Sequence, residues 1–116
     1  MGITYAELGC RDLSASLDFY RGMLGLRRMA DPPGPTPPGV AWLDAGPAGI
    51  RLVERPDGDL AGWEGDDLQR GIRHVGFRVG DVPSYAERLA DAGIEFTLGP
   101  FQAPGDVWIA FFRDPD

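Results

Sequence analysis

The chain has 116 residues, of which 43% are hydrophobic and 25% are charged. A folded chain of this length buries roughly two thirds of the surface that its open form exposes, which supports one core and excludes two independent domains. The 18 acidic residues outnumber the 11 basic ones, giving a net charge of −7, and no stretch forms a basic patch. This balance argues against nucleic-acid binding through phosphate neutralisation.

No apolar run approaches the roughly 18 residues needed to cross a membrane, and the first residues lack the basic-then-apolar pattern of a secretory signal. The chain holds one cysteine, Cys10, which cannot build a disulfide framework or a cysteine-based zinc site. We therefore expect a cytoplasmic protein with no membrane partner and no nucleic-acid partner.

The first predicted element is a β-strand near the N-terminus. Ala6, Leu8 and Cys10 alternate with Tyr5 and Glu7, so that one face is apolar and the other carries polar and aromatic side chains. We expect the apolar face, including Cys10, to pack against helices.

A helix is predicted to follow directly. The carboxylate of Asp12 is placed to accept from the free backbone N–H groups of the first turn, and Gly25 suits the position after the last turn. Between these two residues, apolar side chains recur at helical spacing at Leu13, Leu17, Tyr20 and Leu24.

The rest of the first half is predicted to be strands and loops. Residues 27–29 form a short strand, and 31–39 form a loop because five of these nine residues are proline. Val40–Asp44 and residues 50–54 then form two strands joined by a turn.

The second half of the sequence repeats the hydrophobic periodicity of the first half and its helix-capping and helix-ending residues. Segment 72–94 matches segment 3–26 at an offset of 69 residues. Asp81 caps a second predicted helix, and Gly93 ends it. The segment before that helix alternates like a strand, with one face formed by Val75, Phe77 and Val79.

Two further strands are predicted after the second helix, over residues 95–98 and Val107–Phe112, with a loop over 99–106. The predicted order is therefore β-α-β-β-β followed by β-α-β-β. The second copy is one strand short of the first.

Three signatures occur in order along the chain: Asp12-Leu13 with Ser16, Phe19-Tyr20 and Leu24-Gly25-Leu26; then GIRHVGFRV over residues 71–79; and finally FFRDPD over residues 111–116. In this pattern the chain resembles the vicinal oxygen chelate superfamily. That superfamily includes glyoxalase I, bleomycin-resistance proteins, methylmalonyl-CoA epimerases and extradiol dioxygenases.

The resemblance implies an α+β fold of two βαβββ modules that curl around a shared cavity, commonly as a homodimer. The chain would be a single domain over residues 1–116, with module one over about 1–55, a connector over about 56–70 and module two over about 71–116. The last strand of module two would be absent from these residues.

The resemblance also locates the positions that bind a metal in metal-dependent members, which are on the first and last strands of each module. The first-strand positions are Tyr5 and His74, the last-strand position of module one is Arg51, and the fourth lies beyond Asp116. Only His74 is a usual ligand, and Arg51 has no lone pair and repels a cation. We therefore expect no metal and no cofactor.

His74 and Glu7 are the candidate catalytic residues. His74 either is a hydrogen-bonded residue of the cavity without a catalytic task, or acts as a general base or a donor that orients a ligand. Glu7 either forms an ion pair with Arg51 or Arg78, or acts as a base or binds an ammonium group. If Glu7 is buried and paired, Glu7→Gln is expected to cost about 3 kcal/mol.

The tryptophans are the other candidates. Trp42 and Trp108 lie on predicted strands, where they either pack in the core or stack on a planar ligand. Trp63, in the connector, either covers the cavity or lies at a dimer interface. The full predicted ligand-binding set is Tyr5, Trp42, Arg51, His74, Arg78 and Trp108.

The sequence thus predicts a homodimer that binds a small organic molecule without metal and, by resemblance to bleomycin-resistance proteins, sequesters a drug or metabolite. The tryptophans favour an aromatic ligand, and the acidic net charge makes a cationic ligand an option. The alternative is a lyase, isomerase or dioxygenase that uses His74 or Glu7, either metal-free or with ligands completed beyond residue 116. We also expect either that the chain continues past Asp116 or that a partner covers the edge of strand Val107–Phe112.

Overall fold

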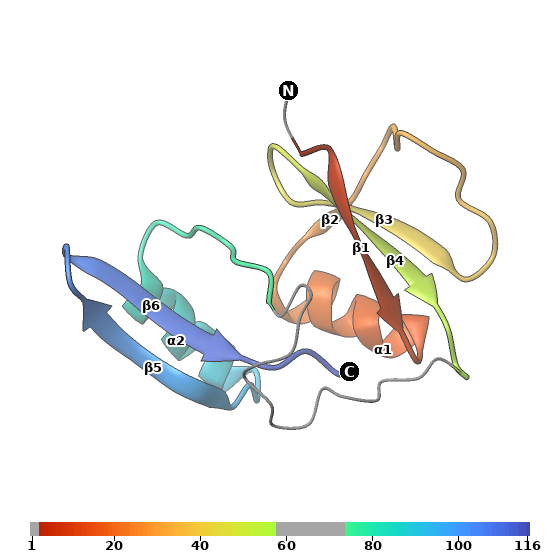
Figure 1. Cartoon of the computed structure of the whole chain (residues 1–116). Coiled ribbons are helices and arrows are strands. Elements are labelled where there is room, and N and C mark those ends of the chain that lie inside the picture. The colour runs from red at the N-terminus through yellow and green to blue at the C-terminus, as the bar shows by residue number, and fades with distance from the viewer. Residues whose placement is uncertain (1–2, 58–73) are drawn as a thin grey trace.

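The computed structural model describes residues 3–57 and 74–116, so Trp63 and most of the predicted connector lie outside the described residues. Two groups of elements lie side by side, which we call module one and module two (Figure 1). Module one consists of β1 (Tyr5–Cys10), α1 (Leu13–Leu17), the π-helical turn η1 (Asp18–Met23), β2 (Arg27–Arg28), β3 (Val40–Asp44) and β4 (Gly49–Glu54).

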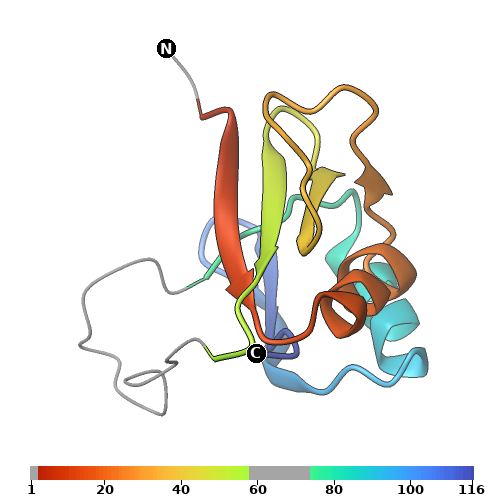
Figure 2. The same cartoon turned by 90° about the vertical axis from the view of Figure 1, so that its right-hand side faces the viewer.

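The strands of module one form one sheet in the order β1-β4-β3-β2. β1 runs parallel to β4, whereas β3 is antiparallel to both of its neighbours. The predicted alternation along β1 is confirmed, because Cys10 is buried while Tyr5 and Glu7 are exposed. Both helical segments lie on one side of this sheet and leave its other face free of helix (Figure 2).

The predicted first helix forms with the expected cap and stop. The Asp12 carboxylate accepts from the backbone N–H of Ala15 at 3.1 Å. In the last turn the N–H of Leu24 donates to the carbonyl of Phe19 at 3.0 Å, a five-residue step that widens the helix. Gly25 then adopts a φ of +79°, which a residue without a Cβ reaches at little cost.

Module two consists of α2 (Val82–Asp91), β5 (Phe96–Ala103) and β6 (Val107–Phe112), and Asp81 caps α2 as predicted. The predicted loop over 99–106 is too long, because β5 continues through Pro100 to Ala103. A register shift between Leu98 and Phe101 allows this, since an irregular pairing removes proline from the hydrogen-bonded ladder.

The strand predicted before α2 is not formed in the described residues. Apolar and polar side chains alternate along residues 74–79 as they do in a strand. These residues nevertheless do not form a strand, and they pair with no other described strand. Module one supplies the reason, because there β1 pairs only with β4. No counterpart of β4 follows β6 among the described residues, so segment 74–79 has no strand to pair with.

One core joins the two modules. It contains residues from module one and from α2 and the turn after it: Cys10, Phe19, Tyr20, Leu24, Ala41, Leu43, Ile50, Leu52, Leu89 and Ile94. The Tyr85 hydroxyl donates to the carbonyl of Leu24 at 2.7 Å, and the Tyr20 hydroxyl donates to Asp114 at 2.7 Å. In the described part of the chain, no helix is long and apolar enough to cross a membrane.

Candidate functional site

A row of three side chains crosses the helix-free face of module one. Glu7 on β1 is paired in register with Arg51 on β4, which is paired with Trp42 on β3. Residues that are paired across neighbouring strands project from the same face of a sheet. The strand register therefore brings together a carboxylate, a guanidinium and an indole that are far apart in the sequence.

Two arginines hold the single carboxylate of this row. Arg51 Nη1 lies 2.5 Å from Glu7 Oε2, and Arg55 Nη2 lies 3.5 Å from Glu7 Oε1. This is the ion pair with Arg51 that the sequence offered as one reading of Glu7; the other offered partner, Arg78, lines a pocket in module two. Two guanidinium groups against one carboxylate leave a local charge of about +1, opposite in sign to the whole chain.

Trp42 forms the floor of this site. The residue is only 5% exposed, and its indole Nε1–H donates to the carbonyl of Pro35 at 3.1 Å. The Arg51 guanidinium carbon lies 5.5 Å from the ring centroid, within the range of a cation–π contact. Tyr5 meets the indole edge-to-face at a centroid distance of 4.9 Å and is itself 43% exposed.

The exposed aromatic surface at this site is therefore the ring of Tyr5, and the buried indole of Trp42 packs against that ring. The proline-rich loop, residues 31–39, borders the site, and a Cβ placed on Gly34 would lie 3.3 Å from the indole. We refer to Tyr5, Glu7, Trp42, Arg51 and Arg55 as the sheet-face site.

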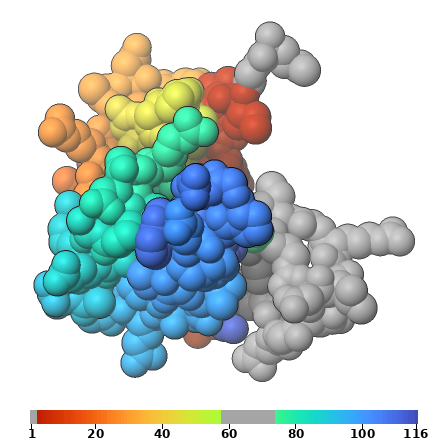
Figure 3. All heavy atoms as spheres, turned by 90° about the vertical axis from the view of Figure 1, so that its left-hand side faces the viewer, coloured from red at the N-terminus to blue at the C-terminus, as the bar shows by residue number. Residues whose placement is uncertain are grey.

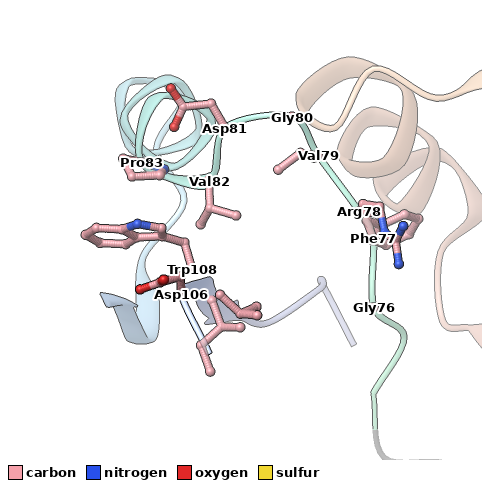
Figure 4. Close-up of a pocket in the computed structure, with 12 residues that line it drawn as sticks. Gly76, Phe77, Arg78, Val79, Gly80, Asp81, Val82, Pro83, Asp106 and Trp108 are labelled. Atoms are coloured by element: carbon pink, nitrogen blue, oxygen red, sulfur yellow. The ribbon is translucent and has the colours of Figure 1, made fainter. Parts of the chain in front are cut away.

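The remaining predicted residues lie elsewhere. The His74 ring meets Phe111 edge-to-face at 5.7 Å, which places it against β6. Arg78 and Trp108 line a pocket in module two. Trp108 shares its strand face with Phe112, which packs on the core, and it stands beside Val82 and Pro83 of α2 (Figure 4).

Two members of the site were missed by the sequence analysis. Arg55 reaches Glu7 because its backbone N–H donates to the carbonyl of Cys10 at 2.7 Å, extending the parallel pairing of β1 with β4. Pro35 contributes its carbonyl through the loop. A parallel register between β1 and β4 would have indicated Arg55, whereas no sequence signal indicates Pro35.

The buried titratable groups near β1 are structural. Burial raises the pKa of the Cys10 thiol, which keeps it protonated and unreactive, as expected for a packing residue. Burial and the neighbouring Asp114 carboxylate raise the pKa of Tyr20 above its ordinary value. Both groups lie on the helix side of the sheet, away from the sheet-face site.

The residues of the sheet-face site do not fit a divalent metal ion. Among residues 3–57 and 74–116, no group of three or more His, Cys, Asp and Glu side chains is placed to hold one. Arg51 occupies the centre of the row, and both oxygens of Glu7 face guanidinium groups. Arg51 and Arg55 would repel a cation at this position, and the site offers too few ligand atoms to bind one.

Solved structures share this fold along almost the whole chain. A glyoxalase/dioxygenase from Nostoc punctiforme superposes with a TM-score of 0.82 at 21% identity, covering 99% of this chain and 84% of that one. TnmS3, an antibiotic-binding protein from Streptomyces sp. CB03234, has a TM-score of 0.67 at 23% identity, covering 100% and 88%. A lactoylglutathione lyase from Agrobacterium tumefaciens has a TM-score of 0.62 at 21% identity, covering 98% and 86%.

These identities are low, so the similarities establish the fold and leave the activity open. The sequence profile of the Glyoxalase/Bleomycin resistance protein/Dioxygenase superfamily matches residues 2–116. The α+β fold and the family predicted from the sequence are thereby confirmed. The chain belongs to the Glyoxalase/Bleomycin resistance protein/Dioxygenase superfamily.

Proposed function

We propose that the protein binds a small aromatic molecule at the sheet-face site and sequesters it without metal and without chemical conversion. The observation that carries this proposal is the Glu7–Arg51–Trp42 row, with the exposed Tyr5 ring against its indole end. A ligand site of this kind needs an apolar surface and a few fixed polar groups. The row offers both on one face.

Each residue has a distinct task in this proposal. Tyr5 offers the exposed ring on which a planar ligand stacks, and Trp42 supports that ring from below. Arg51 donates to an oxygen of the ligand, while Glu7 keeps the guanidinium in place. The hydrogen bond from Trp42 to the Pro35 carbonyl fixes the indole, so that the surface is formed before the ligand arrives.

The local charge favours a ligand with an oxygen acceptor, such as a carbonyl, a phenolate or a carboxylate. The net charge of −7 suggested a cationic ligand as an option. Arg51 and Arg55 outweigh Glu7 at the site itself, however, and short-range charge decides binding because distant charges are screened over about 10 Å. TnmS3, an antibiotic-binding protein that shares this fold, agrees with a binding function.

The enzyme alternative has less support. Both oxygens of Glu7 face guanidinium groups, which leaves the carboxylate poorly placed to remove a proton. In the described part of the chain, no hydrogen bond or ion pair links His74 to Glu7 or Tyr5. We therefore develop the binding function alone.

The proposal is tested with three naphthalene probes of similar size and different charge: 1-naphthoate, 1-naphthol and 1-naphthylmethylammonium. Isothermal titration should give the tightest binding for naphthoate and the weakest for the ammonium. Tyr5→Ala should weaken naphthoate binding by about 5- to 30-fold, since an aromatic contact is worth roughly 1 to 2 kcal/mol. Arg51→Met, which keeps an unbranched stem, should remove the preference for the anion.

Trp108→Phe is the matched control, because it changes an exposed aromatic residue of module two. It should leave naphthoate affinity unchanged. Equal loss of affinity in Trp108→Phe and Tyr5→Ala would contradict the proposal, as would a wild-type protein that binds none of the three probes or that converts one of them.

A further inference from the structure

Arg55 reaches the sheet-face site from just beyond the end of β4. In an extended chain it lies roughly 13 Å along the strand from Arg51, so its side chain must turn back along the sheet to reach the same carboxylate. Its Nη2 lies 3.5 Å from Glu7 Oε1, and its side chain is 60% exposed. This distance exceeds that of a good hydrogen bond, so Arg55 contributes mainly its positive charge to the site.

Gly9 makes room for this path of the Arg55 side chain. It lies on the same face of β1 as Glu7, and its φ is outside the left-handed region, so the strand conformation itself does not require glycine. A Cβ placed on Gly9 would lie 3.6 Å from the Cδ and 4.0 Å from the Nε of Arg55, which shows that the Arg55 stem passes over this residue. Glycine inside a strand weakens it and often marks a place where another group approaches closely.

The net charge of this face depends on Arg55. Glu7 and Arg51 alone form a neutral pair, and Arg55 brings the local charge to about +1. Asp44, farther along the same face, is paired across β2 and β3 with Arg27, so these two residues add no net charge. One negative charge on a ligand therefore neutralises the site, whereas a second would meet only the repulsion of Glu7.

We propose that Arg55, held in place over Gly9, determines the ligand class of the sheet-face site, and that this class is an aromatic monoanion. The inference rests on the binding function proposed above. Such a ligand carries one carboxylate or phenolate on a planar ring. It has access to the site, because Tyr5 and Glu7 are exposed and β1, red in Figure 3, reaches the surface beside module two.

The first experiment measures the ratio of 1-naphthoate affinity to 1-naphthol affinity by isothermal titration at pH 7. The two probes share one ring system and differ by one negative charge. Arg55→Met keeps an unbranched stem and brings the local charge to zero, so it should lower this ratio about 3- to 10-fold. Arg21→Met is the matched control, because it removes the same charge from η1 on the helical side of the sheet, and it should change the ratio less than twofold.

Glu7→Gln changes the charge in the opposite direction. Glutamine keeps an oxygen that accepts from Arg51, but the local charge becomes about +2. The wild type should bind naphthalene-1,4-dicarboxylate no more tightly than 1-naphthoate, because its site balances only one negative charge. Glu7→Gln should bind the dicarboxylate at least threefold more tightly than 1-naphthoate at the same salt concentration.

Gly9→Val tests the path of Arg55 without changing any charge. The two methyl groups of valine would occupy the space of the Arg55 stem, and valine suits a strand better than glycine does. The variant should therefore melt no lower than the wild type and should still lose the preference for naphthoate, as Arg55→Met does. Gly9→Ala adds a Cβ at an ordinary contact distance and should lose less of that preference.

The failure of this inference differs from the failure of the binding function. A wild-type protein that binds none of the naphthalene probes would overturn both. Probes that bind with the same naphthoate-to-naphthol ratio in the wild type and Arg55→Met would leave the binding function standing and overturn the role of Arg55. Equal effects of Arg21→Met and Arg55→Met would do the same, as would a Glu7→Gln variant that does not favour the dicarboxylate.

Discussion

The sheet-face site depends on which residues face each other across strands. Sequence alternation correctly placed Tyr5 and Glu7 on the face opposite Cys10. It also named Arg51 as one of two partners for Glu7, but it could not choose between Arg51 and Arg78. The register between β1 and β4 decides this, and register depends on tertiary pairing that a single strand does not encode.

Exposure changes the expected energy of that ion pair. The Glu7 side chain is 40% exposed and that of Arg51 is 20% exposed, so the 3 kcal/mol expected for a buried pair does not apply. Glu7→Gln should reduce the free energy of unfolding by less than about 1 kcal/mol, as for other solvent-accessible pairs. Urea unfolding measures this, and a loss above about 2 kcal/mol would show that the pair is shielded from water.

The Tyr20–Asp114 contact predicts a dependence of stability on alkaline pH. Burial and the Asp114 charge raise the pKa of Tyr20 in the folded state, whereas the unfolded chain keeps a value of about 10. Below about pH 10 the tyrosine is protonated in both states, so stability is unaffected. Above it the unfolded tyrosine ionises first, and stability falls as pH rises.

Tyr20→Phe separates this effect from general alkaline unfolding. The variant loses a hydrogen bond to a carboxylate and should be less stable by about 1 to 2 kcal/mol at neutral pH. Its stability should then decline less between pH 9 and 11 than that of the wild type. If the stability of the two proteins declined equally with rising pH, Tyr20 would not be the cause of the alkaline loss of stability.

At the scale of elements, helices were easier to predict than strands. Both helix starts were placed correctly from Asp12 and Asp81, because a cap acts on backbone groups within the same turn. The strand predicted through residues 74–79 has the right alternation, but no described strand lies next to it to pair with. Alternation reports which residues could form a strand, whereas a ladder also needs a partner strand.

The cap of α2 gives a prediction at this scale. The Asp81 carboxylate accepts from the hydroxyl of Ser84 at 2.7 Å and from its backbone N–H at 3.4 Å. Asp81→Ala should lower the free energy of unfolding by about 1 kcal/mol. Asp91→Ala, at the other end of the helix, should have no such cost, because a negative charge there is not stabilised by the helix dipole. Thermal unfolding of the two variants compares them directly.

At the scale of the whole molecule, the order of elements was predictable because the sequence repeats its own pattern, and the fold class followed from the resemblance to a known family. The packing of the modules was not predictable, since it depends on contacts such as Tyr85 with Leu24 that join residues distant in sequence. The same limit applies to Trp108, for which the sequence left both core packing and stacking on a ligand open. Its strand face points toward α2, and only the placement of β6 against the helices determines this.

The shared core predicts that the two modules unfold together. Leu89 in α2 is 2% exposed and packs in the same cluster as Cys10 and Leu52 of module one. Leu89→Ala should cost about 2 to 5 kcal/mol, as for other buried leucines. Tryptophan fluorescence and helical circular dichroism should still report a single transition. Separate midpoints for the two signals would mean that the modules are independently stable.

The central claim is that a small aromatic ligand binds at the sheet-face site of module one and leaves module two unchanged. Two-dimensional NMR of the tryptophan indole N–H groups tests it in one measurement. Adding 1-naphthoate should shift the Trp42 signal, whose N–H donates to Pro35, and leave the Trp108 signal in place. Naphthoate that shifts Trp108 while leaving Trp42 unchanged, or that shifts neither, would contradict the account.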